Sequence, residues 1–100
     1  MKTLELNQNS LEELAKSVLD IEADSILKLK DRINDNMKTA VDTIIKSSGR
    51  VIVTGMGKSG HIGRKIAATL SSTGTPAYFL HPAESTHGDS GIITRQDVVI

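Results

Sequence analysis

The segment VIVTGMGKSGHIGRKIA, residues 51–67, constrains the fold more than any other part of the sequence. It opens with Val51, Ile52 and Val53, a β-branched run of the kind that is buried on both faces in a parallel sheet. A glycine-rich corner follows, and apolar residues then return at helical spacing. The segment therefore predicts a buried strand, a tight turn and a helix, the first two elements of a βαβ unit.

The remaining C-terminal residues complete this unit. STGTP, at residues 72–76, breaks the helix, and AYFL after it predicts a second strand. The polar stretch HPAESTHGDSG predicts a loop or short helix, TRQD a turn, and VVI, residues 98–100, a third strand. We expect an α/β fold in which residues 49–100 are the first part of a parallel sheet that continues beyond residue 100, because two or three strands leave an apolar edge unpaired.

The first half of the sequence predicts two amphipathic helices. Ser10 and Glu13 have the spacing of a capping box, which predicts a first helix from about Leu11. The second helix carries an apolar stripe around Val41 and is expected to end at KSSG, with Gly49 in a left-handed conformation. We expect these helices, residues 1–48, to pack on the later domain.

Composition excludes several classes of protein. One hundred residues with 38% hydrophobic content suit one small core, and 12 basic residues balance 12 acidic ones, so no net charge attracts nucleic acid or an anionic membrane. The absence of cysteine excludes disulfides and thiolate metal sites and is typical of a reducing cytosol. No apolar stretch approaches the roughly 20 residues of a membrane span, and MKTLELNQNS lacks the apolar core of a signal peptide. We therefore predict a soluble, cytoplasmic protein.

The glycine corner has the composition of a phosphate site. Gly55, Gly57 and Gly60 match G-x-G-x-x-G between a strand and a helix, where free amides of the first helical turn face a ligand. An anion there gains roughly 0.3–1 kcal/mol from the helix dipole, before direct hydrogen bonds. Lys58 adds a cation and Ser59 a hydroxyl donor. The corner therefore predicts phosphate binding.

Three alternatives to a simple sugar phosphate stay open for this corner. A nucleoside triphosphate loop needs a glycine where Ile52 stands, and a dinucleotide site needs an acid about 20 residues past the motif, near His81. A purely structural interpretation has the glycines permit a tight turn, with Ser59 capping the helix and Lys58 solvated. A monophosphate on a small sugar fits best, because it needs one anion site and no ribose acid.

A second polar loop follows the second predicted strand at the same edge of the sheet. It contains His81, Glu84, His87 and Asp89, and we expect it to face the same crevice as the glycine corner. His87 could donate to a sugar hydroxyl or transfer a proton, and Glu84 could accept one. The alternative is a turn in which Asp89 bonds local amides. The loop's two histidines and two carboxylates could ligate zinc, but the spacing matches no helical H-x-x-x-H pair, so we assign no metal site.

The residues TGMGKSGHIGRKIAATLSSTGTPA, with HPAE and HGD after them, resemble the sugar isomerase (SIS) domain, specifically the arabinose 5-phosphate isomerases of bacterial lipopolysaccharide synthesis. The likeness covers residues 49–93 closely. It implies a flavodoxin-like, three-layer α/β/α domain with a five-stranded parallel sheet, assembled as a homotetramer. The implied reaction interconverts D-ribulose 5-phosphate and D-arabinose 5-phosphate without a cofactor, and the implied partner is a sugar phosphate.

The resemblance also implies roles for individual residues. It assigns catalysis to Lys58 and His87, and Ser90 departs from it by replacing the usual leucine after HGD. The residues implied in substrate binding are Gly57, Ser59, Gly60 and Glu84. The serine-rich phosphate loop, further catalytic residues and a pair of CBS domains would lie beyond residue 100.

Isomerisation through an enediol needs a base, an electrophile at the carbonyl oxygen and an anchor for the phosphate. We expect Lys58 to stabilise the developing oxyanion and His87 to contact sugar hydroxyls, with the base elsewhere. Residues 1–100 alone are therefore expected to be inactive. The alternative function is a non-catalytic regulatory SIS module that binds a sugar phosphate, although the helical half has no basic face or helix-turn-helix spacing.

Overall fold

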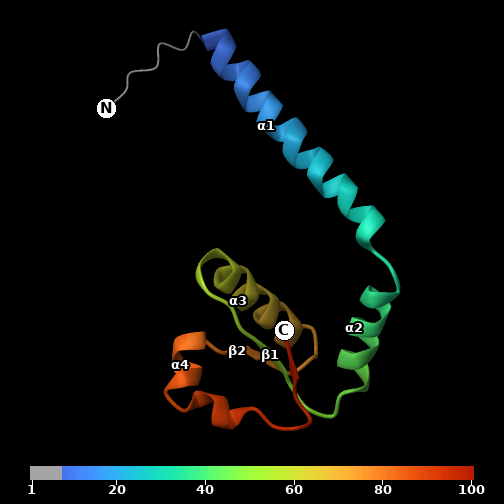
Figure 1. The fold of residues 1–100 in the computed structure, drawn as a ribbon, viewed down its shortest axis with the longest axis vertical. Coiled ribbons are helices and arrows are strands. Elements are labelled where there is room, and N and C mark those ends of the chain that lie inside the picture. Colours follow the sequence, from blue (N-terminus) through green and yellow to red (C-terminus); the bar gives the residue numbers. More distant parts are fainter. Residues whose placement is uncertain (1–7) are drawn as a thin grey trace. The chain divides into compact units, whose positions relative to one another are not determined.

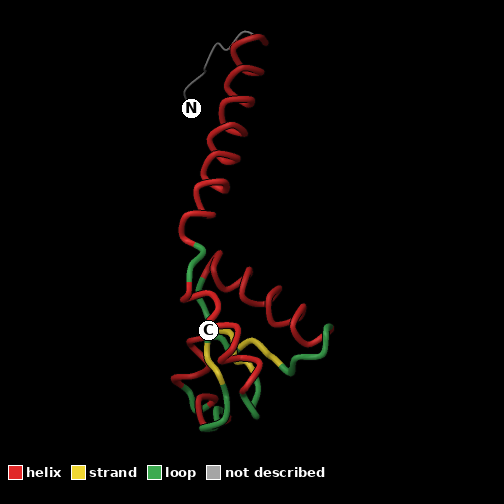
Figure 2. Tube along the Cα trace, turned by 90° about the vertical axis from the view of Figure 1, so that its right-hand side faces the viewer, coloured by secondary structure: helices red, strands yellow, loops and turns green. Residues whose placement is uncertain are grey.

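The computed structural model describes residues 8–100, which fall into two compact units divided between Met37 and Lys38. In the first unit, α1 (Gln8–Lys28) is one long continuous helix (Figure 2), and the short 3-10 helix η1 (Leu29–Arg32) follows it along the chain. The predicted first helix is confirmed, but the predicted capping box is wrong. Because the helical backbone already includes Gln8, Ser10 lies inside the helix and not at its N-cap position.

The apolar side chains of α1 are exposed, so this helix does not form a core of its own. Its exposed large apolar residues are Leu11, Leu14, Val18, Leu19, Ile21, Ile26 and Leu27. Among the described residues, no helix is both long enough and apolar enough to cross a bilayer. How residues 1–48 pack on the later residues stays a prediction.

The second unit contains a three-stranded parallel sheet in the order β2-β1-β3, with β1 and β2 labelled in Figure 1. Its strands are β1 (Val51–Val53), β2 (Ala77–Phe79) and β3 (Val98–Val99). The helices that follow η1 along the chain are α2 (Asp35–Lys46), α3 (Gly57–Ser72), α4 (Pro82–Thr86) and the 3-10 helix η2 (Asp89–Ile92). Val51 pairs with Ala77 on one side and Val98 on the other, so all three predicted strands and the βαβ order are confirmed.

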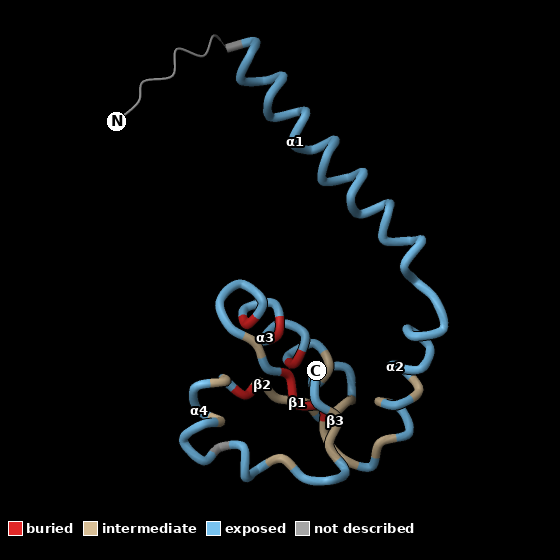
Figure 3. The backbone as a smooth tube through the Cα atoms, viewed as in Figure 1, coloured by how far each residue is buried: buried red, intermediate tan, exposed pale blue. Residues whose placement is uncertain are grey.

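The core lies between β1 and α3. Val51 and Val53 are each 2% exposed and pack with Ala67 of α3. Ile52 is fully buried as well, and the alternation of side chains along a strand turns it to the other side of the sheet. Figure 3 shows buried positions on β1 and α3. A Cβ on Gly63 would lie 3.0 Å from Val53 Cγ1, so glycine at this position lets the helix approach the strand closely. This packing fixes the start of α3 relative to the end of β1.

Left-handed glycine occurs after α3 and not, as predicted, after α2. Gly74 has φ +101°, and the next residue, Thr75, donates its N–H to the Leu70 carbonyl at 2.9 Å, which closes the helix in a Schellman motif. Gly49 does not have a positive φ. It is needed for another reason: a Cβ there would overlap the backbone carbonyl of Gln96.

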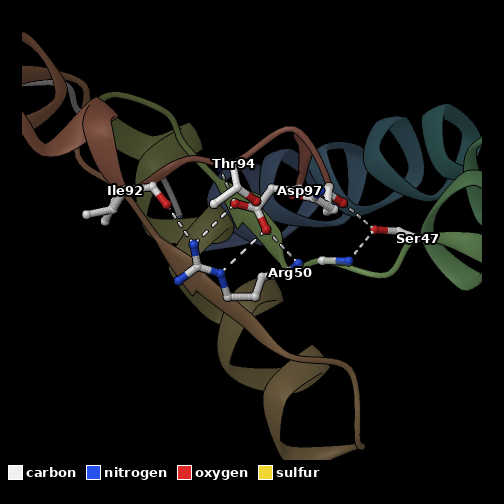
Figure 4. A network of polar contacts seen from close by, with 7 residues as sticks. Ser47, Arg50, Ile92, Thr94 and Asp97 are labelled. Carbon is white, nitrogen blue, oxygen red and sulfur yellow. Dashed lines mark hydrogen bonds and ion pairs between the residues drawn. The ribbon is translucent and has the colours of Figure 1, made fainter.

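A polar network joins the amino ends of β1 and β3 (Figure 4). The Asp97 carboxylate accepts the backbone N–H groups of Arg50 and Thr94, each at 2.7 Å, and pairs with the Arg50 guanidinium at 3.2 Å. Arg50 Nη2 also donates to the Ile92 carbonyl at 2.7 Å. The network holds the predicted TRQD turn against the start of β1, at the opposite end of the sheet from the glycine corner.

Candidate active site

The glycines of the corner between β1 and α3 have different structural roles. Gly57 has φ +61°, a left-handed conformation, and a Cβ there would meet nothing within 4 Å. A Cβ on Gly60 would lie 2.6 Å from the carbonyl oxygen of Gly55. Gly57 is therefore required by backbone conformation and leaves open space beside it, whereas Gly60 is required by close contact between α3 and the end of the strand.

The first turn of α3 presents backbone amides that have no partner within the helix. Met56 is the N-cap and makes no side-chain capping bond, and the first helical bond runs from the Gly60 N–H to the Met56 carbonyl at 3.2 Å. The amides of Gly57, Lys58 and Ser59 precede that bond. Ser59 lies inside the first turn, so the alternative that it serves as the N-cap is wrong, and the turn keeps the donors that an anion would use.

Lys58 and Ser59 line a cavity of about 370 Å³ at the carboxyl ends of β1 and β3. The other lining residues are Val53, Thr54, Ile62, Gly63, Ile66 and Ile100. In this sheet the chain runs from β1 to β2 on one side and then to β3 on the other, so the strand order reverses between β1 and β3. Open α/β sheets bind their ligands at this reversal.

We call this cavity the lysine pocket. Its polar side chains are those of Thr54, Lys58 and Ser59, and isoleucine and valine side chains with Gly63 form the rest of its lining. Lys58 is exposed, and no acidic side chain in the described part of the chain forms an ion pair with it. An unpaired ammonium beside the positive end of a helix favours an anionic ligand. The polar side of the lysine pocket is therefore suited to an anionic ligand, and an apolar wall lies beside it.

A second cavity of about 240 Å³ lies on the β2 side of the same corner. Its lining consists of Gly55, Gly57, Gly60, His61, Arg64, Phe79 and His81, and we call it the arginine pocket. The Arg64 guanidinium carbon lies 4.2 Å from the centroid of the Phe79 ring, a cation–π contact. Both pockets thus border one glycine corner, from opposite sides.

The HPAEST segment forms the short helix α4. His81 is its N-cap: its Nδ1 accepts the Ala83 N–H at 3.1 Å. Glu84 lies in the first turn, and His87 is the C-cap. Of these predicted site residues, His81 shares a pocket with the glycine corner, whereas Glu84 and His87 are not among the described residues that line either pocket.

Among the described residues, no three His, Asp or Glu side chains gather where they could hold a metal ion. The Asp89 side chain, a candidate for local hydrogen bonds, lies outside the described part of the structure.

The sequence analysis assigned no role in a site to Thr54, His61 or Arg64. A usable signal existed for two of them, because His61 and Arg64 are three residues apart on a helix and therefore share a face. Thr54 directly follows β1, at the edge where ligands bind. The contribution of Phe79 could not be anticipated, since it depends on which side chain the second strand brings beneath α3.

The chain matches a known protein family and several known proteins. The SIS domain family model matches residues 44–100. The arabinose 5-phosphate isomerase KdsD of Pseudomonas aeruginosa is 52% identical over 86 residues, 86% of this chain and 26% of that protein. KdsD of Escherichia coli strain K12 is 52% identical over 89 residues, 89% of this chain and 27% of that protein. The chain thus spans about a quarter of the length of these relatives.

A solved structure of the c3406 protein of Escherichia coli CFT073, in complex with arabinose 5-phosphate, has the same fold. It superposes with a TM-score of 0.85 at 36% identity, over 94% of this chain and 50% of that one. The α/β architecture seen here is therefore shared with a protein that binds a pentose phosphate.

Proposed function

The chain belongs to the SIS domain family, and we propose that it forms part of an aldose–ketose isomerase that interconverts D-ribulose 5-phosphate and D-arabinose 5-phosphate. The observation that carries the proposal is the lysine pocket, where Lys58 and Ser59 extend from the first turn of α3 at the strand-order reversal. Support comes from the KdsD isomerases that match most of this chain and from the structural neighbour solved with arabinose 5-phosphate.

In this proposal the first turn of α3 anchors the phosphate. The free amides of Lys58 and Ser59 and the Ser59 hydroxyl give a phosphoryl group its donors, and Gly57 leaves open space beside them. Gly60 contributes by packing, because a Cβ there would lie 2.6 Å from the Gly55 carbonyl oxygen. A dianion there is further stabilised by the dipole of α3. Anchoring the phosphate leaves the sugar carbons to be held beside Lys58.

Lys58 is proposed as the electrophile of the reaction. Moving a proton between adjacent carbons places negative charge on the carbonyl oxygen, and an ammonium positioned there stabilises the enediolate more than the substrate. His87 and Glu84, which follow β2 at the same edge of the sheet, are proposed to contact the sugar hydroxyls. No carboxylate or imidazole lines the lysine pocket in the described part of the chain, so we propose that the base comes from elsewhere in the complete enzyme.

The finer properties of the enzyme are proposals as well. We propose that it acts in the cytoplasm as a homotetramer, on a substrate used for lipopolysaccharide synthesis. The exposed apolar face of α1 supports association with further protein surface.

A chimera tests the proposed role of Lys58. Residues 1–100 replace the matching segment of the Pseudomonas aeruginosa KdsD, and isomerase activity is assayed with ribulose 5-phosphate. Lys58→Ala should lower kcat by about 10²-fold or more, because one preorganised charge at a developing oxyanion contributes that much. Lys65→Ala, on the same helix but outside both pockets, is the matched control and should stay within about twofold of the parent, as surface substitutions do. Comparable activity of the two variants would remove Lys58 from the mechanism.

A further inference from the structure

The arginine pocket contains cationic and hydrogen-bond-donating groups but no acid. Its lining includes two imidazoles and one guanidinium, from His61, Arg64 and His81, and it includes neither aspartate nor glutamate. In the described part of the chain no carboxylate pairs with Arg64. We propose that this pocket is a second anion-binding site, for a small ligand that carries a phosphoryl or carboxylate group.

Arg64 is held in place before any ligand binds. Its guanidinium lies 4.2 Å from the Phe79 ring centroid, and this contact limits the orientations that the long side chain adopts. A guanidinium lying over an aromatic ring keeps its N–H groups at the periphery, and its planar fork matches the two oxygens of a carboxylate or phosphate. Less conformational entropy is lost on binding because the group is already positioned.

His81 has its hydrogen-bonding state set by the backbone. Its Nδ1 accepts the Ala83 N–H at 3.1 Å, so in the neutral ring the proton lies on Nε2, which is then a donor. Its ring packs edge-on to Phe79, with centroids 6.5 Å apart and an interplanar angle of 75°. Phe79 thus contacts both His81 and Arg64, which brings a guanidinium and an imidazole donor to one pocket.

This site does not depend on the proposed isomerase activity. The arginine pocket and the lysine pocket share none of their lining residues, although both adjoin the first turn of α3. Occupancy of one can therefore be detected separately from occupancy of the other. Because the two sites adjoin a single helical turn, a ligand in the arginine pocket is placed to influence the substrate site.

The test is a titration of the 100-residue chain followed by ¹H–¹⁵N NMR at constant ionic strength and pH. Inorganic phosphate and acetate are the probes, and the amides of His61, Arg64 and His81 report on the site. Arg64→Met should weaken binding at these amides about tenfold, the loss expected for a charge-assisted hydrogen bond. Lys65→Met removes the same charge one residue away, outside the pocket, and should change the affinity less than twofold. If these amides shift with phosphate alone, the site takes a phosphoryl group. If they shift with acetate as well, the site also accepts a carboxylate group.

A second variant keeps the test valid if Arg64→Met unfolds. His81→Asn retains a side-chain acceptor for the Ala83 amide, and asparagine is a favoured N-cap, so α4 should persist while the Nε2 donor is lost. Weaker anion binding by His81→Asn, with unchanged binding by Lys58→Met, supports the site. Two results would overturn the proposed second site. One is an equal loss of anion affinity in Arg64→Met and Lys65→Met, and the other is chemical-shift changes confined to the amides of the lysine pocket.

Discussion

Asp97 is the residue whose ionisation is most strongly tied to the folded state. Its side chain is 1% exposed, and the N–H groups of Thr94 and Arg50, together with the Arg50 guanidinium, hold the pKa of Asp97 far below its ordinary value (Figure 4). The unfolded chain takes up a proton at this residue near pH 4, whereas the folded chain does not. The contribution of Asp97 to stability is therefore fully present above about pH 4 and is lost as the pH falls further.

Replacement of Asp97 should consequently flatten the acid dependence of stability. Asp97→Asn is expected to lower the melting temperature by several degrees at pH 7, and the difference from the parent chain should shrink towards pH 3. Thermal unfolding followed by circular dichroism between pH 3 and 7 checks this. Asp42→Asn, which removes an exposed ion pair with Lys38, is the control and should leave the curve nearly unchanged. If the melting temperatures of Asp97→Asn and the parent chain differed by the same amount at every pH, the lowered pKa of Asp97 would not explain the loss of stability.

Tyr78 presents an unsatisfied polar group. Its hydroxyl is buried and has no hydrogen-bond partner among the described residues, a situation that costs about 1–3 kcal/mol. Tyr78→Phe should therefore raise the free energy of unfolding by about 1 kcal/mol, because the ring and its contact with the Arg50 guanidinium, 5.0 Å away, are kept. Urea denaturation measures the change. Tyr78→Leu, which removes the ring as well, should be destabilising, and a loss of stability in Tyr78→Phe would indicate a hidden partner for the hydroxyl.

At the scale of elements, the junction of β1 and α3 predicts a graded response to alanine substitution. Gly60→Ala places a methyl group 2.6 Å from the Gly55 carbonyl oxygen, so the helix must shift, at a cost of about 1–3 kcal/mol. In Gly57→Ala the added methyl group touches no other atom, but alanine must adopt the left-handed conformation of Gly57, which costs about 1–2 kcal/mol. Gly91→Ala has open space and no positive φ, and should be near neutral. Urea midpoints for the three variants check the order, and a Gly91 variant as unstable as the Gly60 variant would refute it.

The type and order of these elements could be predicted because each leaves a local pattern. The β-branched run of β1 and the helical spacing of α3 are properties of neighbouring residues, and the structure confirms both. Helix ends were less predictable. Ser10 has the right spacing for a capping box, yet the helix continues past it towards Gln8, and Gly49 is required by Gln96, a residue far along the chain. Such contacts depend on tertiary packing that local spacing does not encode.

At the scale of the whole molecule, the sequence predicts the glycine corner as a phosphate site, but it does not predict that the surrounding residues line two separate cavities. Lys58 and Ser59 were identified from the glycine motif, and they do line a cavity at the expected edge of the sheet. Nothing in the sequence indicates that His81 would lie in a different cavity from Lys58, because that depends on the placement of β2 and β3 on opposite sides of β1. The grouping of site residues follows from sheet topology, which spacing within one motif does not specify.

At the scale of the whole molecule, we expect residues 1–100 to bind a sugar phosphate without isomerising it. The lysine pocket contains an ammonium and phosphate donors but no carboxylate or imidazole among its described lining, so a step that removes a proton from carbon lacks its base. Residues 1–100 alone should therefore bind a pentose 5-phosphate at the amides of Lys58 and Ser59 in an NMR titration, yet show no isomerase activity. The chimera with the Pseudomonas aeruginosa relative, which restores the remaining three-quarters of such an enzyme, should be active with the same substrate. Turnover by the 100-residue chain itself would show that the base is already present, with Glu84 and His87 the first residues to replace.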